Sequence, residues 1–130
     1  MVVVYIGLGS NIGNRDKNLE RAIDFLNLLA GKLITMSGLY ESEPWGFKSE
    51  HKFLNQVIKI ETSLDPFILL DKISQIERDM GRKKNTARYT DRIIDIDILF
   101  YDKLKVNQDN LQIPHPRILQ RKFTAASVCC

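Results

Sequence analysis

Apolar residues follow two different periods along this chain and predict six elements. Runs rich in β-branched residues are typical of strands, and apolar residues three or four positions apart are typical of helices. The elements cover about residues 2–8, 16–29, 33–40, 53–62, 66–80 and 93–100. Their order, strand, helix, strand, strand, helix, strand, favours an α+β fold with a ferredoxin-like βαββαβ core, in which both helices pack on one face of an antiparallel sheet. We expect an extra C-terminal hairpin, ending at Ile113, to extend this core.

Capping residues and glycines indicate where the two helices begin and end. Asn14 or Asp16 can cap the first helix, and Gly31 follows it. Asp65-Pro66 is a strong start for the second helix, which Gly81 ends, because aspartate accepts from free amides and proline suits the first turn. The predicted buried stripes are Leu19, Ala22, Ile23, Leu26 and Leu29 in the first helix and Leu69, Leu70, Ile73, Ile76 and Met80 in the second.

Two aspartates interrupt the last strand. Asp95 and Asp97 are two residues apart in an isoleucine-rich run, so in a strand they share one face, with Cα atoms roughly 7 Å apart. The two carboxylates would repel each other, unless one or two divalent cations bind them and carry phosphate oxygens. Arg88 and Arg92, just upstream, could meet the remaining phosphate charge. The alternative is a half-exposed strand with aspartates on its solvent face, but aspartate is depleted in strands, which favours the metal site.

Composition limits the class of protein. The 130 residues, 44% hydrophobic and 27% charged, predict a single soluble domain over 1–130. Neither a membrane span of about 20 apolar residues nor a signal peptide is evident, and the adjacent Cys129 and Cys130 indicate a reducing compartment, so we expect a cytoplasmic protein that does not bind membranes. The net charge of +3 fits a small anionic substrate better than nucleic acid.

Two long polar connections are candidates for loops that cover a site. The first, 41–52, contains Trp45, which favours a lid, although the ring could instead pack on the core. The second, 82–91, is basic and has few apolar anchors. It could be a solvated run of charge, but the nearby aspartates favour a lid that closes over phosphate.

The chain resembles the 6-hydroxymethyl-7,8-dihydropterin pyrophosphokinase family of the folate pathway, which transfers a pyrophosphoryl group from ATP to a pterin alcohol. Several motifs in the right order, over nearly the whole chain, carry the resemblance. They are Tyr5-Ile-Gly-Leu-Gly-Ser-Asn11, Tyr40-Glu-Ser-Glu-Pro-Trp-Gly46, Phe53-Leu-Asn55, Arg88, Arg92, Asp95, Asp97, Pro114-His115 and Arg121-Lys-Phe123. The resemblance implies release of AMP.

The resemblance also implies residue roles. Asp95 and Asp97 would hold two Mg²⁺ ions with ATP, and Arg82 and Arg92 would be catalytic. The implied ATP contacts are Glu77, Lys84, Arg88, Ile98, His115 and Arg121. The implied pterin contacts are Ser42, Trp45, Phe53, Asn55 and Phe123. We expect a monomer, with a dimer as the alternative.

Departures from the family pattern concern the lid and the end of the chain. They are Lys84 for a common Arg, Tyr89 for Trp, Asp91 for a frequent Pro, Ile93 for Thr and Pro116 for an aromatic residue. Lysine in place of arginine replaces a planar guanidinium, which can donate two parallel hydrogen bonds, by a compact ammonium group. Family members continue some tens of residues past Phe123, so we expect this chain to lack the family's C-terminal segment.

Three other functions compete with this interpretation. Gly7, Gly9 and Gly13 are close to a dinucleotide fingerprint, but the third glycine is one residue late. A ferredoxin-like sheet can bind RNA, although paired aspartates would repel phosphate and no RNP1-like motif is present. Another nucleotidyltransferase or glycosyltransferase that uses Asp-x-Asp remains an alternative.

Overall fold

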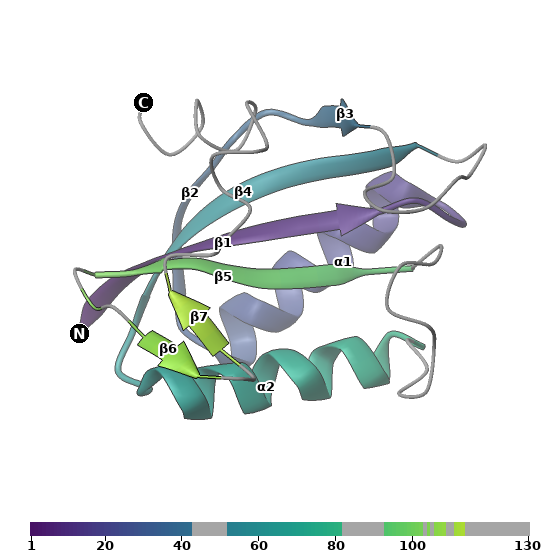
Figure 1. The fold of residues 1–130 in the computed structure, drawn as a ribbon. Coiled ribbons are helices and arrows are strands. Elements are labelled where there is room, and N and C mark those ends of the chain that lie inside the picture. Colours follow the sequence, from purple (N-terminus) through teal and green to yellow (C-terminus); the bar gives the residue numbers. More distant parts are fainter. Residues whose placement is uncertain (43–51, 82–92, 103, 105, 109–110, 114–130) are drawn as a thin grey trace.

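A single antiparallel sheet carries both helices on one face (Figure 1). The computed structural model describes residues 1–42, 52–81, 93–102, 104, 106–108 and 111–113. The elements are β1 (Val2–Ser10), α1 (Arg15–Leu29), β2 (Lys32–Met36), β3 (Tyr40–Ser42), β4 (Phe53–Thr62), α2 (Pro66–Asp79), β5 (Asp95–Tyr101), β6 (Val106–Gln108) and β7 (Leu111–Ile113). The predicted α+β class is confirmed.

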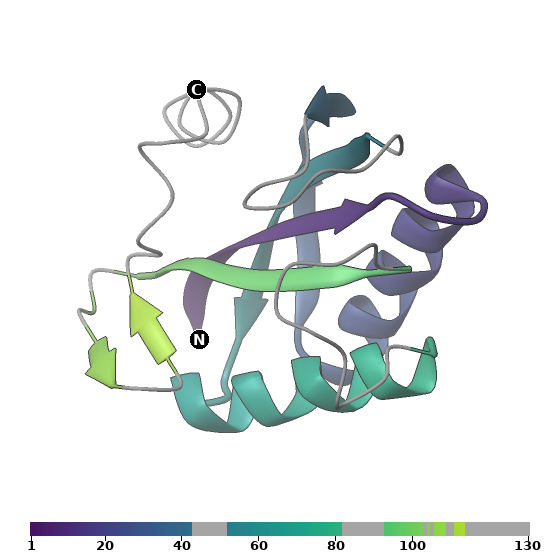
Figure 2. The ribbon, with the colours of Figure 1, turned by 45° about the vertical axis from the view of Figure 1, so that its right-hand side comes forward.

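The five-stranded sheet has the order β2-β4-β1-β5, and β3 pairs with β4 beyond the end of β2. The central strand β1 is antiparallel to both neighbours, β4 and β5. This pairing excludes the parallel sheet that a dinucleotide-binding fold requires. Strands β6 and β7 pair with each other as a separate two-stranded sheet, which lies beside β5 and α2 in Figures 1 and 2.

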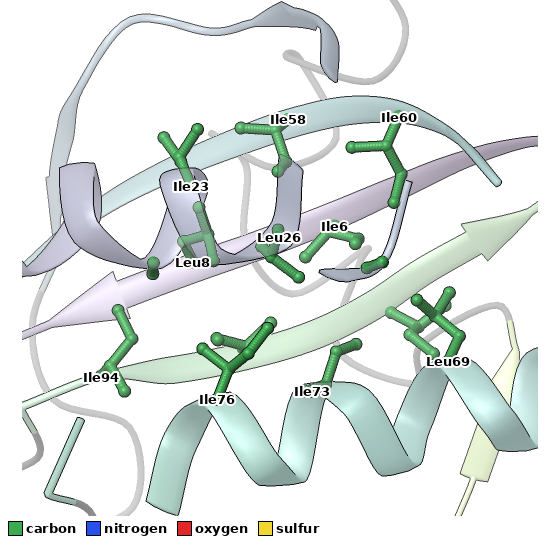
Figure 3. Packing of buried hydrophobic residues seen from close by; sticks show 14 of the residues in the cluster. Ile6, Leu8, Ile23, Leu26, Ile58, Ile60, Leu69, Ile73, Ile76 and Ile94 are labelled. Atoms are coloured by element: carbon green, nitrogen blue, oxygen red, sulfur yellow. The ribbon is translucent and has the colours of Figure 1, made fainter. Parts of the chain in front are cut away.

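The main core lies between the sheet and the two helices (Figure 3). Alternate residues of β1, β4 and β5 point into it, and they meet the apolar stripes predicted for α1 and α2. The most deeply buried side chains include Ile6, Leu19, Leu26, Ile58, Ile60, Leu69, Ile73, Ile76 and Ile94. The core therefore occupies one face of the sheet, and the opposite face is left for a functional site.

Side-chain caps fix where both helices begin. The Asn14 side chain accepts a hydrogen bond from the Lys17 amide at 3.2 Å, so Asn14 rather than Asp16 is the cap of α1. One oxygen of Asp65 accepts from the amides of Phe67 and Ile68 at 2.9 and 3.0 Å, as the Asp-Pro pattern predicts. Neither helix combines the length and the apolar character needed to cross a bilayer within the described part of the chain.

The strand predicted over 33–40 was wrong in one respect, because it is broken in two. Strand β2 ends at Met36 and β3 begins at Tyr40. Between them Ser37 donates its amide to the Val57 carbonyl at 2.8 Å, and its hydroxyl accepts from the Val57 amide at 2.9 Å. The hydroxyl thus replaces a main-chain carbonyl as a partner of β4, and the regular ladder stops at this serine.

A β-bulge divides β5 into two halves. Asp95 and Asp97 pair with Gly9 and Gly7, Ile98 pairs with Ile6, and the register then shifts so that Phe100 pairs with Tyr5. Leu99 is the additional residue. It packs with Val57 on the face opposite the helices, where the Tyr5 and Phe100 rings meet edge to face with centroids 6.2 Å apart.

The far half of β5 ends at Tyr101, whose hydroxyl donates to the Leu64 carbonyl. Burial of the ring, assisted by the carboxylates of Asp65 and Asp102, raises the pKa of Tyr101 above its ordinary value of 10.0.

Because of this raised pKa, the unfolded chain loses the Tyr101 proton at a lower pH than the folded chain. We expect the free energy of unfolding to fall as the pH rises above about 10, and to fall less steeply in Tyr101→Phe. Denaturant titrations between pH 8 and 11 would test this, and parallel curves for the two proteins would contradict it.

Candidate active site

The two aspartates lie on the sheet face that the helices leave uncovered. Since Asp95 pairs with Gly9 and Asp97 with Gly7, both carboxylates project from the same face, as the sequence predicts. On the other side of β1, Gly9 pairs with Asn55. Asp95, Gly9 and Asn55 therefore form one row across three strands, with the outer Cα atoms roughly 10 Å apart, two strand spacings.

Because Gly7 and Gly9 have no side chains, β1 leaves open space between the aspartates and Asn55. A Cβ atom built on Gly9 would lie 3.2 Å from the Asn55 side-chain oxygen and 3.3 Å from the Phe53 ring, and one on Gly7 would lie 3.3 Å from Leu99. Side chains on β1 would therefore crowd the space between the aspartates and Asn55. In the sequence, Gly7 and Gly9 belong to a near-match to a nucleotide fingerprint and to a family motif, and their position opposite the aspartates is visible only once the strand register is known.

Asn55 is held in one orientation. The residue is 4% exposed, and its side-chain nitrogen donates to the Ser42 hydroxyl at 2.8 Å, to the Tyr40 carbonyl at 3.1 Å and to the Phe53 carbonyl at 3.3 Å. The acceptor oxygen lies on the side of Gly9. Three of the predicted pterin contacts, Ser42, Phe53 and Asn55, are thereby brought together at the junction of β3 and β4.

The donor set suits a hard divalent cation. Asp95 and Asp97 are half-buried and supply carboxylate oxygens, the ligands that Mg²⁺ prefers. Within the described ranges no cluster of three or more histidine, cysteine, aspartate or glutamate side chains could hold a metal. Two carboxylates, with water and phosphate completing the shell, match the usual Mg²⁺ sites of phosphoryl-transfer enzymes.

Glu77 supports the strand that carries the aspartates. It projects from α2, is half-buried, and accepts a hydrogen bond from the Ile96 amide at 3.0 Å. The sequence predicts that this carboxylate needs a partner, and the structure supplies a main-chain amide of β5. Because Ile96 lies between Asp95 and Asp97, the bond restrains the main chain from which both aspartates project.

Several predicted site residues belong to segments outside the described ranges. Arg82, Lys84, Arg88, Arg92, His115, Arg121, Trp45 and Phe123 lie outside the described residues. Trp45 lies in the segment between Ser42 and Lys52, and the arginines and Lys84 lie in the segment between Gly81 and Ile93. The strands that follow these two segments, β4 and β5, begin at the same end of the sheet, because both are antiparallel to β1 (Figure 1). His115, Arg121 and Phe123 follow β7. The Ile98 side chain is buried in the core, so a nucleotide could meet only the main chain of this residue.

Comparison with known proteins finds relatives that belong to one class of enzyme, the pterin pyrophosphokinases. Curated relatives named 2-amino-4-hydroxy-6-hydroxymethyldihydropteridine pyrophosphokinase match nearly all of the chain. The Porphyromonas gingivalis protein is 45% identical over 126 residues, which are 95% of this chain and 86% of that protein. The Bacillus subtilis protein is 39% identical over 125 residues, 95% of this chain and 74% of that protein.

The profile of the 7,8-dihydro-6-hydroxymethylpterin-pyrophosphokinase (HPPK) family matches residues 5–130. The chain belongs to this family, and the resemblance seen in the sequence is confirmed.

A solved structure shares the fold. The Plasmodium falciparum HPPK-DHPS protein crystallised with pteroate superposes with a TM-score of 0.76 at 18% identity, over 98% of this chain. This chain spans 38% of the length of that protein. The similarity confirms an HPPK-type fold.

Proposed function

We propose that this chain transfers the pyrophosphoryl group of ATP to the hydroxymethyl group of 6-hydroxymethyl-7,8-dihydropterin, releasing AMP, as a step of folate synthesis. The family and its named relatives support the reaction. The observation that carries the proposal is the row on the sheet face, where Asp95 and Asn55 flank Gly9. Carboxylates for a phosphate-bound metal and a fixed amide for a heterocycle lie on either side of one open strand.

On the nucleotide side, Asp95 and Asp97 would hold two magnesium ions together with ATP, and such ions supply neutralisation of the triphosphate charge. Arg82 and Arg92 are proposed to stabilise the transferred group, with Glu77, Lys84, Arg88, Ile98, His115 and Arg121 as further ATP contacts. The hydroxymethyl oxygen would bond to the β-phosphorus while the bond from that phosphorus to the bridging oxygen of AMP breaks. The hydroxyl proton would pass to solvent.

On the pterin side, Asn55 would bind the heterocycle by its side-chain amide. Phe53 offers a ring next to Gly9, and Ser42 fixes the asparagine amide. Trp45 and Phe123 complete the proposed contacts. Catalysis then rests on positioning and charge, without a covalent intermediate.

Product analysis tests the proposal. The protein is incubated with ATP, Mg²⁺ and the reduced hydroxymethylpterin, and AMP is separated from ADP. We expect AMP to form only when pterin and metal are both present. ADP would indicate ordinary kinase chemistry, and absence of any product from folded protein would count against the proposal.

Asn55→Ala separates the two halves of the site. The substitution removes the amide that faces the heterocycle, and we expect the KM for the pterin to rise at least about tenfold while the Kd for ATP changes less than about twofold. Gln56→Ala is the matched control, because this neighbouring buried amide points to the opposite side of the sheet and donates to the Ser37 carbonyl at 2.9 Å. Equal losses of pterin and ATP binding in Asn55→Ala would contradict the assignment.

The remaining expectations stay proposals: a cytoplasmic monomer that acts on these two small molecules without nucleic acid. Sedimentation at micromolar concentration and an RNA gel-shift assay would test the assembly and the RNA-binding alternative. A stable dimer would contradict the expected monomer, and a specific shift of RNA would contradict the expectation that the protein acts without nucleic acid.

A further inference from the structure

Arg15 connects three segments that are distant in the sequence. It is the first residue of α1, a position set by the Asn14 cap. One terminal nitrogen of its guanidinium donates to a carboxylate oxygen of Glu41 in β3 at 3.1 Å and to the carbonyl of Lys52 at 2.9 Å. The start of α1 is thereby tied to β3 and to the residue that precedes β4.

Each of these two contacts lies next to a proposed pterin contact. Glu41 precedes Ser42, and Lys52 precedes Phe53. Ser42 and Phe53 are in turn paired across β3 and β4, and both accept from the Asn55 amide. Arg15 therefore binds the side chain of Glu41 and the main chain of Lys52, each one residue away from a group that fixes Asn55.

The contact reaches β3 from the side opposite the site. Along a strand successive side chains alternate, so Glu41 points away from Tyr40 and Ser42. Its partner across the ladder, Leu54, is buried on the helix side. β3 is thus held by Arg15 on the helix face and by the bond between Ser42 and Asn55 on the site face.

A short strand benefits from such additional contacts. β3 has three residues and pairs with β4 alone among the described strands. Strands this short are near the lower limit of what a sheet contains, and each lost contact is a sizeable part of their anchoring.

We propose that Arg15 is a positioning residue for the pterin side of the site, which it supports by fixing Glu41 and Lys52 and thereby the junction of β3 and β4. The inference rests on the proposed function, in which Asn55, Ser42 and Phe53 meet the pterin. It assigns to Arg15 no contact with either substrate.

The expected effect is moderate. The Arg15 and Glu41 side chains are 32% and 56% exposed, and exposed ion pairs are weak and screened by salt. The bond to the Lys52 carbonyl adds a charge-assisted hydrogen bond. We expect Arg15→Met to raise the KM for the pterin about three- to tenfold, with the Kd for ATP and kcat within about twofold of wild type.

Two further variants make the test specific. Arg21→Met removes the same charge from an exposed position of the same helix and should leave the pterin KM unchanged. Arg15→Lys keeps the positive charge but not the planar guanidinium, and it should recover part of the loss. Raising the salt concentration should shift wild type toward Arg15→Met, because it weakens the Glu41 contact.

The outcomes separate this inference from the proposed function. If wild type forms no AMP, the proposed function fails. Hydrogen exchange of the Ser42 and Phe53 amides, measured without substrate, then decides the role of Arg15. Faster exchange in Arg15→Met but not in Arg21→Met supports the positioning role. If wild type forms AMP and Arg15→Met has an unchanged pterin KM, or loses pterin and ATP binding equally, the inference is overturned.

Discussion

Replacing Asp95 or Asp97 by asparagine is expected to lower the rate of AMP formation by roughly 10³-fold, or about 4 kcal/mol in the barrier. Asparagine has nearly the same shape, so the strand should keep its pairing with Gly7 and Gly9. What changes is the negative charge that binds a divalent cation and, through it, the triphosphate. The measurement is AMP formation at saturating Mg²⁺, together with ATP binding with and without the metal.

Asp71→Asn provides the matched control, because Asp71 is exposed on α2 and its substitution removes the same charge. It should retain wild-type turnover. Thermal unfolding of all three variants would show that the proteins remain folded. Normal activity in both Asp95→Asn and Asp97→Asn would remove the metal site from the proposal.

Gly31→Ala is expected to cost about 3 kcal/mol of unfolding free energy, which is a large share of the 5–15 kcal/mol typical of a domain. A Cβ atom on Gly31 would lie 2.2 Å from the Glu61 carbonyl oxygen and 3.1 Å from the Thr62 Cβ. The obstacle is main chain, so no flexible side chain can move aside. The neighbouring Ala30 carbonyl accepts from the Thr62 hydroxyl at 2.6 Å, which restrains the same junction of α1 and β4.

Gly38→Ala is the control for this substitution, since nothing lies within 4 Å of a Cβ built there. We expect a change within about 0.5 kcal/mol for Gly38→Ala and a fall in Tm of roughly 10 °C for Gly31→Ala. Scanning calorimetry would measure both. Equal Tm values for the two variants would show that the junction can relax, contrary to the expectation.

Elements with strong local signals could be predicted from the sequence. β4 runs from Phe53 to Thr62 as expected, because its alternation is clear, and α2 follows the Asp65-Pro66 start, because cap and proline act locally. The shared face of Asp95 and Asp97 follows from the period of a strand alone.

Features that depend on partners distant in the sequence could not be predicted. The break after Met36 depends on the bonds between Ser37 and Val57, and the role of Gly9 depends on its register between Asp95 and Asn55. Arg15 carries no motif, and its contacts with Glu41 and Lys52 become visible only when α1, β3 and β4 are assembled.

The bulge at Leu99 also determines how β5 tolerates changes in length. It allows one strand to present Asp95 and Asp97 on the face opposite the helices while Tyr101 turns to the core and binds the Leu64 carbonyl. With Tyr101 anchored, deletion of Leu99 would remove the bulge and place Ile98 and Phe100 next to each other, in register with Ile6 and Tyr5, so both carboxylates would stay on the face opposite the helices. Leu99 is therefore a residue that β5 could exchange or lose at the cost of its packing with Val57, while the two faces of the strand keep their residues.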